Sequence, residues 1–172
     1  HQLVRIIRVV RGRMRFALHL APRLDYGRVA HEIELTEHGA LVTGSDIDIA
    51  IHAIREPNDS RLLELHRDRQ DLYATLELST NEHRGMILES CSGRQRPILP
   101  REVGTRDAWE MFMNTARFWR DWVRRSRYTG RWRETVHRSA ITLKLMTYAP
   151  TGAPVAAATC GLPELVGGER NW

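Results

Sequence analysis

Lysine is almost missing from this sequence of 172 residues, because only Lys144 among its 26 basic residues is a lysine. Cysteine is also scarce: Cys91 and Cys160 are too few for a disulfide framework and predict reduced, structural thiols in a cytosolic chain. No apolar run approaches the roughly 18 residues of a membrane-spanning helix, which predicts a soluble protein without a membrane partner. A signal-peptide pattern and an initiating methionine are absent too, so the start at His1 indicates a piece of a longer chain.

Metal-ligand patterns are likewise missing from the eight histidines. None stands at a metal-ligand spacing with a cysteine or another histidine, so neither a metal site nor a cofactor is expected. His31-Glu32 begins like the helix motif of zinc proteases, but Leu35 stands where the second histidine is needed. Asp46 and Asp48 share a strand face and could pair in acid–base chemistry, although solvated surface carboxylates explain them better. These patterns therefore assign no catalytic residue.

Charge and tryptophan divide the chain into two parts. With 42% hydrophobic and 27% charged residues, the composition is that of a globular protein. Residues 1–107 hold 16 arginines and 16 acidic residues, whereas the net charge of +5 and all five tryptophans fall in residues 108–172. A basic surface is the electrostatic footprint of proteins that bind nucleic acid or another polyanion, so that class needs a test. We place a structural boundary near residue 105.

The first part shows the two-residue alternation of β-strands. We expect strands over residues 14–20, 32–35, 46–52 and 72–78, and a central strand in the more uniformly apolar residues 3–10. In each alternating strand one face is dry and one is wet, which is the pattern of antiparallel strands in a sandwich. Asp46, Asp48 and His52 fall on the wet face of their strand. Strand order cannot be derived from this pattern.

The second part predicts two helices. Thr105 can cap a helix that runs to about Arg125, with Asp107 favourably placed in its first turn. Tyr128-Thr129-Gly130 breaks this helix, and a second one runs from about Trp132 to Tyr148 before Pro150. The apolar stripe of the second helix is broad, which predicts burial on more than one side.

Arginines alternate with aromatic residues through residues 119–133, as in proteins that hold single-stranded nucleic acid. The helical spacing instead favours positions in a core for Trp119 and Trp132. The two interpretations predict opposite exposures of these rings.

Residues 132–172 carry a more specific pattern. They include Trp132-Arg133-Glu134, the run RSAITLKLMTYAPTGAPVAAAT at 138–159, Leu162-Pro163-Glu164, Gly167-Gly168 and Arg170-Asn171-Trp172. This pattern resembles the opening of the catalytic domain in the bacterial branch of glycoside hydrolase family 15. That branch contains glucoamylase-like enzymes, glucodextranases and actinobacterial trehalases. Upstream, the run APRLDYGR at 21–28 resembles the PRFDYGR segment of the family's N-terminal β-sandwich.

The resemblance implies an α+β architecture with three parts. Residues 1–104 would form a β-sandwich that is incomplete at its N-terminal side, residues 105–130 a linker helix, and residues 131–172 the first helix of a six-fold (α/α) barrel. Members of the family are inverting α-glucoside hydrolases that use two glutamates, an acid and a base, about 6.5–9.5 Å apart. Both glutamates lie downstream of Trp172 in the family, so no catalytic residue is expected in this chain.

Site residues implied by the resemblance are few. Asn171 and Trp172 match the edge of the family's substrate pocket and are the substrate-binding residues expected here, although Trp172 could equally be a barrel-core aromatic. Glu164 lies in the matching loop without being the acid or the base. Cys160-Gly161 departs from the small hydroxyl residues that are usual there, which puts the shape of this loop in doubt.

The leading hypothesis is therefore the N-terminal portion of a cytoplasmic glucoamylase- or trehalase-like hydrolase that acts on an α-glucoside or oligosaccharide. The chain alone is expected to be inactive, and its exposed apolar helix face is expected to cause self-association. One alternative is a basic module that binds nucleic acid or another polyanion, with nucleic acid the less favoured partner. Another is a carbohydrate-binding sandwich without catalysis.

Overall fold

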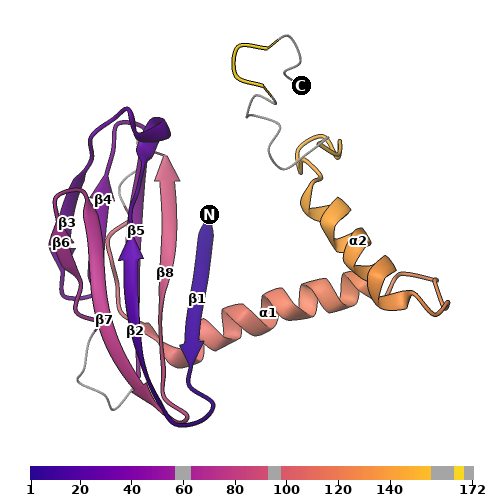
Figure 1. The fold of residues 1–172 in the computed structure, drawn as a ribbon, viewed down its shortest axis with the longest axis horizontal. Coiled ribbons are helices and arrows are strands. Elements are labelled where there is room, and N and C mark those ends of the chain that lie inside the picture. The colour runs from indigo at the N-terminus through magenta and orange to yellow at the C-terminus, as the bar shows by residue number, and fades with distance from the viewer. Residues whose placement is uncertain (57–62, 93–97, 156–164, 169–172) are drawn as a thin grey trace. The chain divides into compact units, whose positions relative to one another are not determined.

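The computed structural model of the chain describes residues 1–56, 63–92, 98–155 and 165–168. The chain divides into two compact units, His1–Met113 and Asn114–Trp172. Unit 1 contains all the strands and the start of the first helix, and unit 2 contains the rest of the helical part (Figure 1). The elements are β1 (Gln2–Arg8), β2 (Arg13–Leu20), the short 3₁₀ helix η1 (Leu24–Gly27), β3 (Glu32–Thr36), β4 (Gly39–Thr43), β5 (Ile47–Arg55), β6 (His66–Asp68), β7 (Asp71–Ser79), β8 (His83–Ser92), β9 (Val103–Gly104), α1 (Thr105–Val123) and α2 (Arg133–Leu145).

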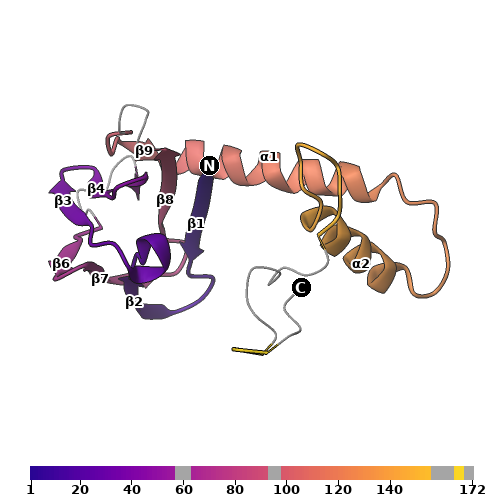
Figure 2. The same ribbon diagram turned by 90° about the horizontal axis from the view of Figure 1, so that it is seen from above.

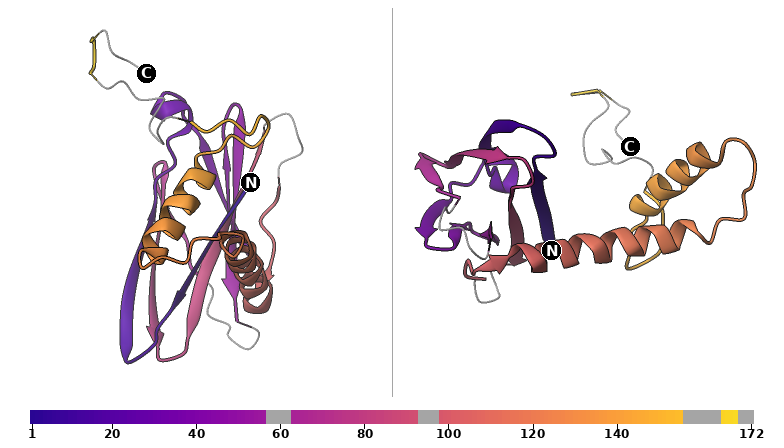
Figure 3. Two further views of the ribbon diagram at one scale, coloured as in Figure 1. Left: turned by 90° about the vertical axis from the view of Figure 1, so that its right-hand side faces the viewer. Right: turned by 90° about the horizontal axis from the view of Figure 1, so that it is seen from below.

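Unit 1 is built from two sheets. The larger sheet has the order β1-β8-β5-β4-β3 with antiparallel neighbours, and β9 joins it in parallel alongside the end of β5. The smaller sheet has the order β2-β7-β6 and is also antiparallel. The views from above and below show the sheets as two layers with the interior between them (Figures 2 and 3). The expected antiparallel β architecture is confirmed.

The core between the two layers is formed by the alternating apolar positions of the strands. Ile51, Val42 and Met86 from the larger sheet meet Leu72 and Ala74 from the smaller one. Leu72, Ala74 and Leu78 of β7 are buried while Tyr73 and Thr75 between them are exposed. The alternation seen in residues 72–78 therefore correctly identified which face of this strand is dry.

A second apolar cluster lies on the other face of the larger sheet. Ile54, Ile87, Val103 and Ala108 are buried there, and Met111 packs against them. The start of α1 therefore covers β5 and β8, which buries both of their faces. The hydroxyl of Thr105 donates to the carbonyl of Arg55 at 3.1 Å, which fixes the helix start to β5. Asp107 lies in the first turn, as expected.

Two predictions for unit 1 are wrong. Residues 3–10 do not form a central strand, since β1 is at the edge of its sheet and pairs only with β8. Its apolar character comes instead from Val4 and Ile6, which pack against the second cluster. Asp48 and His52 do not lie on a wet face, because only 4% and 0% of their surfaces are exposed. Their strand is covered on both sides, so alternation could not distinguish its faces.

Unit 2 differs from its predicted packing. The helix bounds agree to within a few residues, and the break at 128–130 is present. Figure 3 shows α2 and the turn that follows it, where the Tyr148 carbonyl accepts from the Gly152 N–H at 2.8 Å. However, α2 has no buried residue, so the described residues alone do not provide the burial on more than one side that the sequence predicts. Trp132 is 59% exposed instead of lying in a core.

Candidate functional site

The residues expected to bind substrate, Asn171 and Trp172, lie outside the described residues, as do Glu164 and Cys160. Their roles stay predictions. Cys91, the other cysteine, is buried and free, as a structural thiol should be. No helix in the described ranges is long and apolar enough to cross a membrane.

Asp46 and Asp48 do not form a catalytic pair. Asp46 is exposed just before β5, where its carboxylate accepts from the Ser45 hydroxyl at 3.4 Å. Asp48 is buried and accepts from the Gly44 backbone N–H at 3.3 Å, across the turn between β4 and β5. The buried carboxylate therefore stabilises a turn, which is a structural role.

The segment of residues 22–28, which we call the left-handed loop, is the most unusual part of the backbone. It follows β2 and contains η1, the short violet coil beyond the end of β2 in Figure 1. Asp25, Tyr26 and Gly27 have φ angles of 47°, 58° and 79°. A left-handed conformation costs a non-glycine residue about 1–2 kcal/mol, so Asp25 and Tyr26 must be held there by their surroundings.

Three contacts hold the left-handed loop. Arg28 forms an ion pair with Asp25 at 2.8 Å and also donates to the Asp25 carbonyl at 3.2 Å. The side chain of Leu24 sits on Gly44, where any added Cβ atom would overlap it. The third contact is made by Arg23, which reaches the smaller sheet at Asp71. The loop is thereby fastened to both sheets of unit 1.

Asp71, the first residue of β7, is the centre of a polar cluster. Both carboxylate oxygens accept from Arg23, at 2.7 and 3.3 Å, and one also faces His19 Nε2 at 2.9 Å. The hydrogen bonds from Arg23 and His19 hold the pKa of Asp71 well below its usual range. The same carboxylate raises the pKa of the Arg23 guanidinium. Asp71 is therefore a fixed negative charge, which does not suit a general acid.

Aromatic side chains lie against this cluster and on the left-handed loop that is joined to it through Arg23. The ring of His19 stacks on that of Tyr73 with centroids 4.5 Å apart and planes 5° apart, because the two residues are directly opposite in the β2–β7 register. Tyr26 is 87% exposed, and the guanidinium of Arg28 lies 5.5 Å from the centroid of its ring. The arginines of the cluster and of the left-handed loop are paired with aspartates. The surface therefore combines fixed polar groups and aromatic rings with little net charge.

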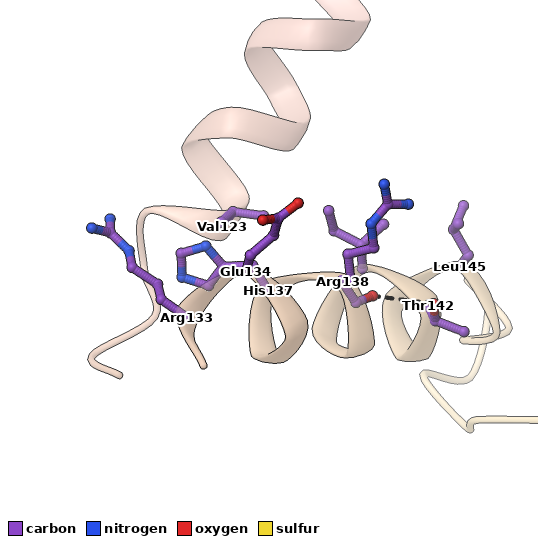
Figure 4. A pocket seen from close by; sticks show the side chains of 8 residues that line it. Val123, Arg133, Glu134, His137, Arg138, Thr142 and Leu145 are labelled. Carbon is purple, nitrogen blue, oxygen red and sulfur yellow. Dashed lines mark hydrogen bonds between the residues drawn. The ribbon is translucent and has the colours of Figure 1, made fainter. Parts of the chain in front are cut away.

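A pocket of about 680 Å³ lies in unit 2 along α2. Figure 4 shows His137, Glu134 and Arg138 projecting into it from the helix, with Val123 from the end of α1. Among the lining residues of this pocket, Glu134 is the one that carries a carboxylate. Hydrolysis of a glycosidic bond by the acid–base mechanism needs two carboxyl groups. The pocket is an open groove along a helix that carries both charged and apolar side chains, and it lacks the groups for that chemistry. Its lining residues are Val123, Arg133, Glu134, His137, Arg138, Ile141, Thr142 and Leu145.

The aromatic rings of the arginine–aromatic segment, residues 119–133, do not form an exposed row on which nucleic-acid bases could stack. Trp119 is partly buried and makes edge contacts with Phe118 and Trp122 at centroid distances of 5.3 and 6.2 Å. Trp132 is exposed, but Arg131 covers its ring at 4.6 Å. Within the described ranges, no group of three histidine, cysteine, aspartate or glutamate side chains is arranged to hold a metal ion.

Sequence reasoning noticed residues 21–28 only through their resemblance and missed Asp71, His19 and Tyr73 altogether. His19 and Tyr73 lie within the strands expected at 14–20 and 72–78, and the register of β2 and β7 brings them together. The signal that could have found Asp71 is its place just before an alternating strand, but many turn aspartates share that place.

Comparison with known proteins identifies relatives over the whole chain. The family described as "Trehalase-like, N-terminal" matches residues 1–105. The trehalase of Mycobacterium tuberculosis is 31% identical over 186 aligned positions, which cover 100% of this chain and 25% of that protein. The trehalase of Thermoplasma acidophilum is 27% identical over 159 positions, covering 92% of this chain and 25% of that protein.

A shorter match is more similar: the trehalase of Thermoplasma volcanium is 52% identical over 58 residues, or 34% of this chain. The chain spans about a quarter of the length of the curated relatives that it matches over most of its own length. No solved structure gives a significant match.

Proposed function

Since the chain belongs to the trehalase-like N-terminal family, we propose that it forms the N-terminal part of an inverting α-glucoside hydrolase of glycoside hydrolase family 15. Residues 1–104 serve as its β-sandwich, 105–130 as its linker helix and 131–172 as the start of its catalytic (α/α) barrel. The observation that carries this proposal is the match of this chain, over 100% of its length, to a quarter of a trehalase.

The exposure of apolar side chains on α2 supports the proposal that this helix is the first helix of a barrel. Leu143 and Leu145, which lie two residues apart and therefore on different faces of α2, are 64% and 67% exposed. Apolar side chains on a helix normally face a partner, and within the described part of unit 2 they have none that buries them. Further helices of a barrel would cover these side chains and the groove beside Leu145. The buried free thiol of Cys91 supports a reducing compartment, which we propose is the cytoplasm.

The chemistry then falls to residues outside the chain. The resemblance places both catalytic glutamates downstream of Trp172, where one would protonate the leaving oxygen and the other would activate water. The acid must have a raised pKa to carry its proton at the working pH. Asn171 and Trp172 would line the edge of the pocket that receives the terminal sugar. The sandwich supplies no reacting group.

The test is to express the open reading frame that contains these residues and to assay glucose release from trehalose, maltose and isomaltose. We expect release from one of these sugars, with product of inverted anomeric configuration detected by NMR. The chain of residues 1–172 alone should release none. Glucose released by residues 1–172 and abolished by a substitution within them would contradict the proposal, as would an inactive full-length protein that is folded.

A further inference from the structure

We propose that the left-handed loop, with Asp71, His19 and Tyr73, is a binding site for a neutral saccharide on the sandwich itself. This inference goes beyond the proposed function, since it assigns a ligand to unit 1. It uses the segment in which two consecutive non-glycine residues, Asp25 and Tyr26, have positive φ angles. Its centre is Tyr26, whose backbone is left-handed and whose ring is 87% exposed.

Backbone strain at an exposed aromatic residue is the first argument. Left-handed residues that are not glycine persist where the surroundings fix them, and they cluster at binding and catalytic sites. Asp25 and Tyr26 are held by the Arg28 ion pair on one side and by Leu24 on Gly44 on the other. A loop fixed in this way loses little conformational entropy when it binds a ligand.

Charge is the second argument, and it determines the ligand class. Arg23 is paired with Asp71, and Arg28 is paired with Asp25. The two pairs cancel, so the surface has no excess positive charge to attract a phosphate or a polyanion. Guanidinium and carboxylate groups held side by side still offer donors and acceptors to neighbouring hydroxyls. An uncharged molecule rich in hydroxyls suits these groups.

The aromatic rings are the third argument. Sugar rings present flat C–H faces that pack against exposed aromatic side chains, which carry a large apolar area and a polar tip. Tyr26 offers such a ring beside the Arg28 guanidinium. Tyr73 is 37% exposed and is stacked on His19, next to the Asp71 carboxylate. The cluster thus combines apolar ring area with fixed hydrogen-bonding groups, as saccharide recognition requires.

The experiment titrates residues 1–172 with maltohexaose, dextran oligosaccharide and trehalose, following amide NMR shifts and heats of binding. We expect a dissociation constant of roughly millimolar, independent of salt, for at least one of the three. Shifts should be confined to residues 19–28 and 71–73. Tyr26→Ala should weaken binding by about tenfold or more, while Tyr26→Phe should keep it within about threefold.

Two further variants separate binding from folding. Gly44→Ala places a Cβ atom against both Leu24 and the backbone carbonyl of Ile47, so it should weaken binding by disturbing the support of the loop although it replaces no group that faces the ligand. Tyr148→Ala, at a tyrosine of unit 2 that is 57% exposed, is the matched control and should bind like the parent chain. No shift at 50 mM of any of the three saccharides would overturn the proposal.

Unchanged binding by Tyr26→Ala would overturn it too, as would shifts confined to unit 2. Binding of single-stranded DNA at this loop with a steep dependence on salt would replace it with a polyanion site. Hydrolysis by the full-length protein is independent of all these outcomes, so the two proposals fail separately.

Discussion

The two units contain similar proportions of apolar residues but bury them to different extents. Every buried hydrophobic residue in the described ranges lies between Val9 and Ala108, inside unit 1. In unit 2, α2 has no buried residue, and Leu143, Leu145 and Tyr148 are each more than half exposed. Unit 1 therefore builds its own core from two sheets and the start of α1. Unit 2 displays apolar side chains that its described residues do not cover, which is the physical basis for proposing the start of a larger helical domain.

The largest expected effect tests the core of unit 1. Ile51→Ala removes a fully buried side chain from the layer between the sheets and should lower the free energy of unfolding by about 2–5 kcal/mol. Urea unfolding followed by far-UV circular dichroism measures it. Leu143→Ala in α2 is the matched control and should change this free energy by less than about 0.5 kcal/mol. Equal losses in the two variants would mean that the units share one core.

A smaller loss is expected at a glycine of the larger sheet. Gly39 has φ of 146°, and an added Cβ atom would overlap the carbonyl oxygen of Ile51 on the neighbouring strand. Gly39→Ala should therefore cost about 1–3 kcal/mol, measured by the same unfolding experiment. Gly152→Ala in unit 2 has φ of 73° but open space around the new Cβ atom. It should leave the unfolding of the sheets unchanged, and a comparable loss there would argue against independent units.

The contrast between the units also explains which predictions succeed. Alternation assigns β7 correctly because one face of the strand packs in the core and the other is wet. It fails for β5, where Asp48 and His52 are buried although they stand at the alternate polar positions, and where β9 and α1 cover the Ile54 end of the strand. Periodicity shows which side chains of a strand can be buried. Whether one face or both faces are covered depends on segments elsewhere in the chain.

Strands β4 and β8 show the same limit. Gly39–Thr43 is short and buried along most of its length, and His83–Ser92 pairs on both sides within the larger sheet. Neither has the clean two-residue pattern that marks a strand with one wet face. Prediction of the site from sequence is limited in a related way, because the ion pair between Arg23 and Asp71 joins residues 48 positions apart. Only the register of β2 and β7 places them together.

A pH effect comes next in size and belongs to unit 1 alone. Burial lowers the pKa of His52 below 6.5, against the opposing hydrogen bond with Glu89. Its Nδ1 accepts from the Arg101 backbone N–H at 3.1 Å, which requires the neutral ring. The unfolded chain binds a proton there more readily, so stability should fall as pH falls below about 6.5 and stay level above it.

His52→Gln tests this assignment. The variant should be less stable at pH 8, since it disturbs a buried hydrogen-bond network, but its stability should depend less on pH between 5 and 7. Urea unfolding across that range measures both effects. His66→Gln, at an exposed histidine of β6, is the control and should keep the parent pH dependence. An unchanged slope in the His52 variant would show that other groups cause the acid sensitivity.

The smallest effect on folding is expected at the exposed leucines of α2. Replacing Leu143 and Leu145 together with glutamine should leave the unfolding of unit 1 unchanged, since both side chains are already mostly in water. It should nevertheless weaken self-association of the chain, because each leucine buried between copies contributes about 1.5–3 kcal/mol. Sedimentation velocity over a range of concentrations measures the association. Val10→Gln, at a 78% exposed side chain of unit 1, is the control and should associate like the parent. A parent chain that stays monomeric at all concentrations would show that these leucines need no cover, and the argument for a barrel beyond α2 would lose its structural support.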